Sequence, residues 1–125
     1  MEIIIEYEQM SSSDVYSNQL IQKPNFISIG HDVEKDSYYL IYNKIQYLIT
    51  SQEIEELFQT LENIELTKLP RLGIGIDGET YMLKISNGWN SVSFEWWSDS
   101  CGDQWKGLML FRDKITGLKE KYIVN

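Results

Sequence analysis

Two side chains in this 125-residue chain could form a nucleophile and base pair, because it has one cysteine, Cys101, and one histidine, His31. A thiol becomes a good nucleophile when an imidazole or a helix N-terminus lowers its pKa. Cys101 lies in a polar segment just before an expected helix, but nothing in the local sequence brings His31 to it. We therefore interpret Cys101 as an incidental thiol and His31 as a turn residue. A small enzyme that uses Cys101 or an acidic cluster stays an alternative.

Regularly spaced carboxylates raise the question of a metal site. Asp32, Glu34 and Asp36 alternate along the chain, and Asp99 and Asp103 are four residues apart. Neither run has the glycine and terminal glutamate of a calcium loop, and one histidine with one cysteine cannot make a four-ligand zinc site. We expect no metal and no other cofactor, with these carboxylates on a solvated surface.

The charge of the chain is unevenly distributed. It has 19 acidic and 11 basic side chains, a formal net charge of −8. Residues 1–65 carry 12 acids and 3 bases, net −9, whereas residues 66–125 carry 7 acids and 8 bases, net +1. An acidic surface repels phosphate backbones, so direct nucleic-acid binding is disfavoured and a basic protein is the better partner.

The compartment is expected to be the cytoplasm. The first ten residues have three glutamates where a secretory signal needs Lys or Arg, and the longest apolar runs are far too short to cross a membrane. A single cysteine also suits a reducing environment.

The length and composition predict one domain over residues 1–125, and its first half favours strands. Residues 2–8 alternate, which would place Ile3, Ile5 and Tyr7 on one face. Residues 26–29 form a second expected strand closed by Gly30, followed by a surface turn over 31–36. Residues 38–42 and 45–49 are then predicted to pair as a hairpin. The spacing fits a two-residue connection over Asn43-Lys44, but this pair lacks the preferred glycine, so a longer connection is the alternative.

A helix is predicted to begin after Thr50, because Thr50 and Glu53 have the spacing of a capping box. The residues at helical spacing that should be buried are Ile54, Leu57, Phe58 and Leu61. The opposite face carries an acidic stripe with no Lys or Arg at helical spacing to neutralise it, namely Glu55, Glu56 and Glu62.

The last third predicts a three-stranded meander and a second helix. Residues 72–76, 79–86 and 91–97 are separated by Asp77-Gly78 and Asn87-Gly88, dipeptides that suit tight turns. Asp103 is the expected N-cap of a helix whose apolar residues recur every three or four positions, namely Trp105, Leu108, Phe111, Ile115 and Leu118. The whole order predicts an α+β fold, a mainly antiparallel sheet with two helices packed on one face.

Tryptophan is concentrated in the same region, and most of these rings should be core. Trp89 at a hairpin tip and Trp97, on the face opposite Trp96, are the two expected to be exposed. Exposed tryptophans beside carboxylates such as Glu95 and Asp99 are typical of a protein-binding hot spot.

The pattern of Asp77-Gly78-Glu79-Thr80-Tyr81, then Val92-Ser93-Phe94-Glu95-Trp96-Trp97, then Trp105 at the head of a final helix resembles small bacterial immunity proteins of polymorphic toxin systems. The resemblance covers roughly residues 72–118. It implies a cytoplasmic, non-enzymatic inhibitor that binds a toxin domain and blocks its active site or an essential surface.

The charge distribution favours the same function independently, because an acidic inhibitor can occupy the basic groove of a toxin that attacks nucleic acid. The residues expected to bind the partner are Glu55, Glu56, Glu62, Asp32, Glu34, Asp36, Trp89, Glu95, Trp97 and Asp99. An adaptor whose partner is not a toxin is the other alternative.

Overall fold

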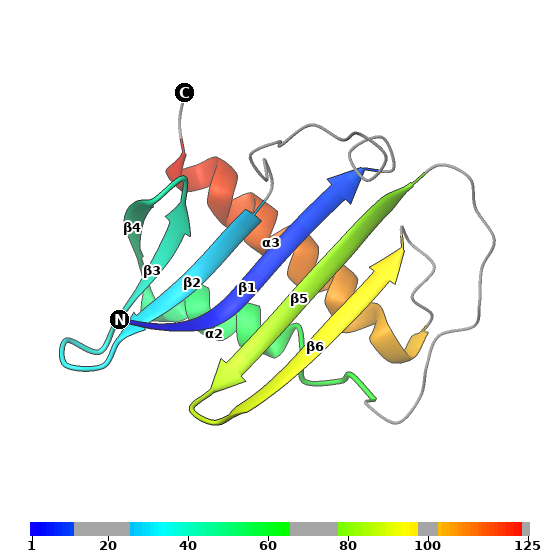
Figure 1. The fold of residues 1–125 in the computed structure, drawn as a ribbon, viewed down its shortest axis with the longest axis horizontal. Helices are drawn as coiled ribbons and strands as arrows, with labels where there is room; N and C mark the ends of the chain where they lie inside the picture. Colours follow the sequence, from blue (N-terminus) through cyan, green and yellow to red (C-terminus); the bar gives the residue numbers. More distant parts are fainter. Residues whose placement is uncertain (12–25, 66–77, 98–102, 124–125) are drawn as a thin grey trace.

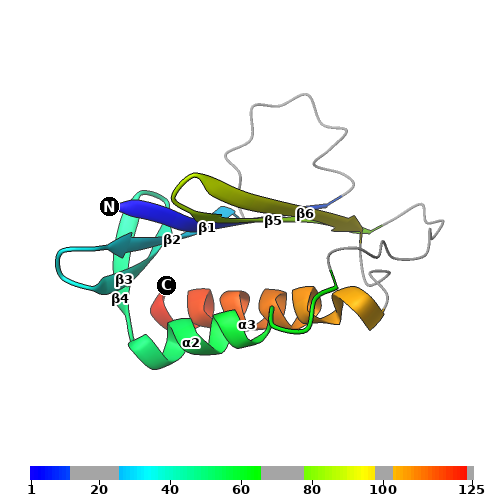
Figure 2. The same ribbon diagram turned by 90° about the horizontal axis from the view of Figure 1, so that it is seen from below.

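The computed structural model describes residues 1–11, 26–65, 78–97 and 103–123. They form a six-stranded sheet in the order β4-β3-β2-β1-β5-β6, in which every neighbouring pair is antiparallel. Figure 2 shows both helices on the same face of this sheet. The predicted α+β architecture is confirmed. The strands are β1 (Glu2–Ser11), β2 (Phe26–Asp32), β3 (Ser37–Tyr42), β4 (Ile45–Ile49), β5 (Glu79–Asn87) and β6 (Asn90–Trp97). The helices are α2 (Ser51–Gln59), the 3-10 turn η1 (Asp103–Trp105) and α3 (Lys106–Tyr122).

The core fills the space between the sheet and the helices. Ile5 and Tyr7 of the central strand β1 are fully buried, and the ring of Tyr7 lies 6.1 Å from that of Phe111 on α3. The other buried contributors from the helices are Ile54, Leu57, Leu108 and Ile115. The opposite face of the sheet, which we call the open face, carries no helix among the described residues (Figures 1 and 2).

Strand β1 departs from simple alternation. Ile3 pairs with Gly30 and Ile5 pairs with Ile29, so Ile4 is an extra residue in a β-bulge. The bulge reverses the alternation, so Ile3, which is 38% exposed, does not share the face of the buried Ile5 and Tyr7, contrary to the prediction.

Strand β2 is longer than predicted. Gly30 does not close the strand but lies buried within it, and His31 and Asp32 continue the strand opposite Tyr38 and Ser37. A Cβ atom at Gly30 would overlap the side chain of Met1, so the glycine permits close packing there. The turn between β2 and β3 is therefore limited to residues 33–36.

Both hairpins have two-residue connections. Asn43 and Lys44 link β3 to β4 with φ values of 51° and 65°, as a type I′ turn requires, so the connection is the two-residue one and not the longer alternative. In the second hairpin Asn87 pairs with Asn90, which makes Gly88 and Trp89 the turn residues in place of the predicted Asn87-Gly88. Gly88 has φ of +60°, where glycine is favoured. The expected strand 72–76 lies outside the described residues.

Helix α2 begins as predicted. Thr50 Oγ1 accepts from the Glu53 N–H, and Glu53 Oε1 accepts from the Thr50 N–H. Its burial is narrower than predicted, because Phe58 is 39% exposed. The prediction for the second helix was wrong in one respect: Asp103 starts the 3-10 turn η1, and the residue at the N-cap of α3 is Trp105.

Candidate protein-binding surface

The structure places the predicted partner-binding residues on three separate surfaces. Glu55 and Glu56 lie on α2 and Glu62 in the turn after it, in the helix layer. Asp32, Glu34, Asp36 and Trp89 lie at one end of the sheet. Glu95 is exposed on the open face opposite Met82, and Trp97, half-buried, is on the same face. Asp99 is outside the described residues.

Part of the acidic charge of α2 is neutralised within the fold. Helix α3 carries most of the basic side chains of the second half, and it packs beside α2 (Figure 2). Lys114 Nζ lies 3.7 Å from Glu56 Oε2, and Lys121 Nζ lies 2.8 Å from Glu53 Oε2. The pattern of residues within α2 gives no sign of these pairs, because both lysines belong to another helix. Glu55 and Glu62 stay exposed.

The end of the sheet gathers acidic and exposed apolar side chains from three segments, and we call it the acidic end. Glu2 pairs with His31 across β1 and β2, and its Oε1 accepts a hydrogen bond of 3.2 Å from the Gly88 N–H in the β5–β6 turn. The start of β1 therefore lies between the β2–β3 turn and the β5–β6 turn (Figure 1). The residues of the acidic end are Met1, Glu2, Ile3, Asp32, Val33, Glu34, Lys35, Asp36 and Trp89, so four carboxylates stand against one lysine.

Local contacts fix the shape of the β2–β3 turn. The His31 ring stacks on Tyr38 with centroids 4.3 Å apart, and its Nε2 lies 3.0 Å from Asp36 Oδ1. Asp32 Oδ1 accepts from the Lys35 N–H at 3.4 Å. Asp32 and Asp36 thus help to hold the turn, while Val33, 66% exposed, and Glu34 point to solvent.

A tryptophan, Trp89, lies fully exposed at the tip of the β5–β6 hairpin. Trp89 is 104% exposed relative to a reference chain, which is rare for so large an apolar side chain. The bond from Glu2 to Gly88 holds the adjacent residue of the turn in place. Tryptophan is among the residue types enriched in protein-binding hot spots, so this exposed indole is a candidate anchor.

Trp89 and three of the carboxylates of the acidic end were predicted from the sequence, whereas Glu2 and Val33 were not. In the sequence Glu2 is only one of three glutamates in an expected opening strand. Its place between two turns follows from the position of β1 between β2 and β5, which no local pattern in the sequence reports.

The open face has a shallow hollow of about 310 Å³ over β1, β5 and β6. Lys84 is the cross-strand neighbour of both Glu6 and Ser93, so an ammonium group lies beside the carboxylates there. The lining residues are Glu6, Glu8, Phe26, Met82, Leu83, Lys84, Ser93 and Phe94. This mixture of charges is less acidic than the end of the sheet.

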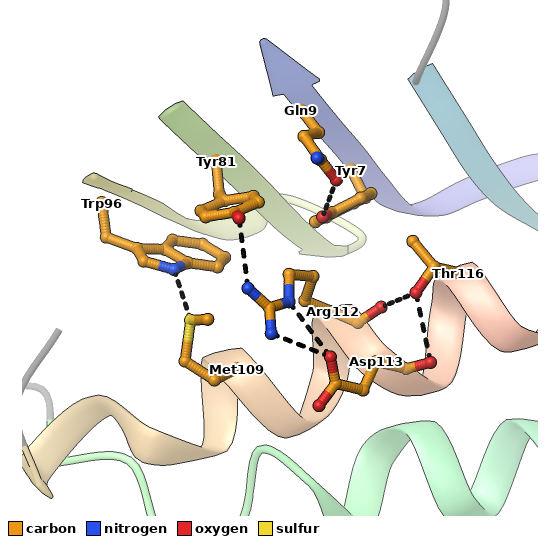
Figure 3. A network of polar contacts seen from close by, with 8 residues as sticks. All are labelled: Tyr7, Gln9, Tyr81, Trp96, Met109, Arg112, Asp113 and Thr116. Atoms are coloured by element: carbon orange, nitrogen blue, oxygen red, sulfur yellow. Dashed lines mark hydrogen bonds and ion pairs between the residues drawn. The ribbon is translucent and has the colours of Figure 1, made fainter. Parts of the chain in front are cut away.

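A polar network joins α3 to the sheet (Figure 3). Arg112 Nη1 donates to the Tyr81 hydroxyl at 3.1 Å, and Arg112 also donates to Asp113 Oδ1. Burial alone would lower the pKa of Arg112, but the hydrogen bonds with Tyr81 and Asp113 outweigh it and raise the pKa. Trp96 Nε1 donates to Met109 Sδ at 3.0 Å.

Tyr7, which lies beside this network, is held in its neutral form, as Arg112 is held in its charged form. Its hydroxyl donates to Gln9 Oε1, and burial raises the pKa of Tyr7 well above its ordinary value. A permanently charged arginine and a neutral tyrosine in a packed interface orient α3, so we assign the network a role in the fold.

A small enzyme that uses Cys101 or an acidic cluster was the alternative left open by the sequence. Cys101 lies outside the described residues, so a meeting with His31 cannot be assigned. No group of three or more His, Cys, Asp or Glu side chains that could hold a metal ion occurs within residues 1–11, 26–65, 78–97 and 103–123. In the same residues no helix is long and apolar enough to cross a membrane.

Comparison with known proteins does not identify a family. No protein-family model, no curated protein and no solved structure matches this chain. The acidic end, with its exposed tryptophan, therefore stands as the candidate site on its own geometry.

Proposed function

We propose that the chain is a protein-binding module that recognises a basic protein through its acidic end. In its most specific form the proposal is a cytoplasmic immunity protein that neutralises a basic toxin domain without enzymatic activity. The observation that carries it is Trp89, fully exposed on a hairpin turn whose Gly88 N–H is held by Glu2.

Two physical effects support this function. The carboxylates of the acidic end would steer a cationic partner towards the surface and raise its association rate. The indole of Trp89 would then be desolvated in the interface, and large aromatic anchors of this kind supply most of the binding free energy. The resemblance of residues 72–118 to immunity proteins agrees with a toxin as the partner.

Growth rescue tests the proposal. If the neighbouring gene encodes a toxin domain, cells that produce that domain should survive when they also produce this chain. Trp89→Ala should abolish or strongly reduce the rescue, because it removes the anchor. Leu110→Ala is the matched control, since Leu110 is 53% exposed on α3, away from the acidic end, and should rescue fully.

The possible results separate the two forms of the proposal. Rescue that survives Trp89→Ala would reject the acidic end as the binding surface. Failure of the wild-type chain to rescue, together with tight binding to a different basic protein that Trp89→Ala weakens, would support an adaptor in place of an immunity protein.

A further inference from the structure

The sheet ends at β4, and the edge of this strand is free of any other described strand. Asn43 and Lys44 form a two-residue turn, so the flanking pair Tyr42 and Ile45 is a hydrogen-bonded pair. Hydrogen-bonded pairs alternate along an antiparallel ladder. The backbone N–H and C=O groups of Gln46 and Leu48 therefore point outward, away from β3.

The two edges of the sheet differ in their protection. On strand β6, the residues whose backbone N–H and C=O groups point away from β5 include Glu95. Charged side chains on an edge strand discourage pairing with another strand. Strand β4, Ile45-Gln46-Tyr47-Leu48-Ile49, has no charged residue and no proline. Ile45 is 55% exposed and Leu48 is 60% exposed. An uncharged edge strand with exposed apolar side chains is suited to strand addition.

The sequence of β4 is complementary to itself in an antiparallel arrangement. With a two-fold axis at Tyr47, Ile45 meets Ile49 of the second copy and Gln46 meets Leu48. The backbone groups of Gln46 and Leu48 point away from β3 in each copy, so the two copies exchange about four hydrogen bonds. We propose that β4 pairs with β4 of a second copy of this chain, which joins two sheets into one continuous sheet in a two-fold symmetric dimer.

The charge distribution favours the antiparallel arrangement. Ile49 lies opposite Tyr38 at the acidic end of the sheet, whereas Lys44 lies at the other end of β4. Antiparallel pairing places the two acidic ends at opposite ends of the paired β4 strands. The repulsion between them is therefore small. It also brings Lys44 of one copy beside Thr50 of the second copy, at the end that carries Asp36. The acidic end of each copy stays exposed, so the dimer does not depend on the function proposed above.

Sedimentation velocity across protein concentrations tests the dimer. The wild-type chain should convert from monomer to dimer as its concentration rises. Leu48→Lys should weaken dimerisation roughly tenfold or more, because it puts a charge on the pairing strand. Leu110→Lys, a matched change on an exposed leucine of α3, should not.

A second pair of variants identifies the edge through the backbone. Gln46→Pro removes an outward N–H of β4, and Ser93→Pro removes the equivalent outward N–H of β6. Circular dichroism and thermal melting would confirm that both variants fold. Gln46→Pro should abolish the dimer and Ser93→Pro should leave it intact. The reverse result, or a wild-type chain that is monomeric at every concentration, would overturn the proposal.

Cross-linking reports the register. In a Cys101→Ser background, Tyr47→Cys places two thiols at the two-fold axis, where Cα atoms are about 4.5 Å apart and a disulfide can form. Ile45→Cys separates its two thiols by about 13 Å along the strand. Mild oxidation should link the first variant and not the second. Equal linking of both, or of the second alone, would reject this pairing.

Discussion

Glu53 on α2 is joined to Lys121 near the end of α3, with 2.8 Å between Oε2 and Nζ, although 68 residues separate them in the sequence. The Tyr122 hydroxyl donates to the other oxygen of the same carboxylate, which also caps α2 through Thr50. The carboxyl side chain is only 11% exposed. Glu53 thus caps the start of α2 and holds the end of α3.

Replacement of this carboxylate is expected to destabilise the fold. Glu53→Gln keeps an oxygen for Thr50 but removes the charge that Lys121 binds, so the free energy of unfolding should fall by about 2 kcal/mol. Glu55→Gln on the exposed face of the same helix should change it by less than about 0.5 kcal/mol. Urea denaturation at pH 7 measures both, and equal stabilities for the two variants would contradict the assigned role.

The same carboxylate makes stability depend on pH. Burial raises the pKa of Glu53, but the hydrogen bonds from Lys121, Tyr122 and Thr50 outweigh this and lower the pKa to about 2 from 4.5. Because the folded-state pKa is the lower one, the stabilisation is complete above pH 4.5 and is lost as the pH falls towards 2. The difference in unfolding free energy between the wild type and Glu53→Gln should therefore shrink between pH 5 and pH 2. A difference that stays constant over that range would show that the charge of Glu53 is unimportant.

Two glycines of α3 should respond in opposite ways to alanine. A Cβ atom at Gly107 would overlap the Thr60 carbonyl oxygen at the end of α2, whereas nothing lies within 4 Å of one at Gly117. Gly107→Ala should destabilise by about 2 kcal/mol, because the helices must move apart. Gly117→Ala should stabilise by about 0.5–1 kcal/mol through helix propensity. Denaturation midpoints compare them directly, and a loss of similar size in both would indicate that close packing at Gly107 is not the cause.

Features that depend on neighbouring residues were predictable from the sequence. The Thr50–Glu53 capping box and the Asn43–Lys44 turn are set by contacts within a few residues, and both were found.

Features that depend on distant pairing were not predictable in this way. The bulge at Ile4 is a feature of the pairing of β1 with β2, and it takes Ile3 off the face that it was expected to share with Ile5 and Tyr7. Likewise, the sequence showed an acidic turn at residues 32–36 and a tryptophan at 89, but their common end of the sheet depends on the strand order. The neutralisation of α2 by α3 is a contact between helices and left no signal within either one.

Trp89 and Trp96 should separate binding from stability. The Trp89 side chain is fully exposed, so Trp89→Ala should change the free energy of unfolding by less than about 0.5 kcal/mol. Trp96 is 5% exposed and stacks on Tyr81 with centroids 5.3 Å apart, so Trp96→Ala should cost about 3–5 kcal/mol. Thermal and urea unfolding provide the measurement. Substantial destabilisation by Trp89→Ala would mean that the indole is covered in solution and cannot serve as an exposed anchor.

Charge reversal at two exposed glutamates should show which acidic surface steers the partner. Glu34 lies at the acidic end and Glu62 lies in the turn after α2, so Glu34→Lys and Glu62→Lys make the same chemical change at separate sites. Stopped-flow association with the purified toxin domain of the neighbouring gene, at low and at physiological salt, measures the effect. Glu34→Lys should slow association roughly tenfold at low salt, and the deficit should narrow as salt screens the charge. Glu62→Lys should have a much smaller effect. If Glu62→Lys slows association and Glu34→Lys does not, the partner approaches the surface of α2, and the acidic end is not the binding site.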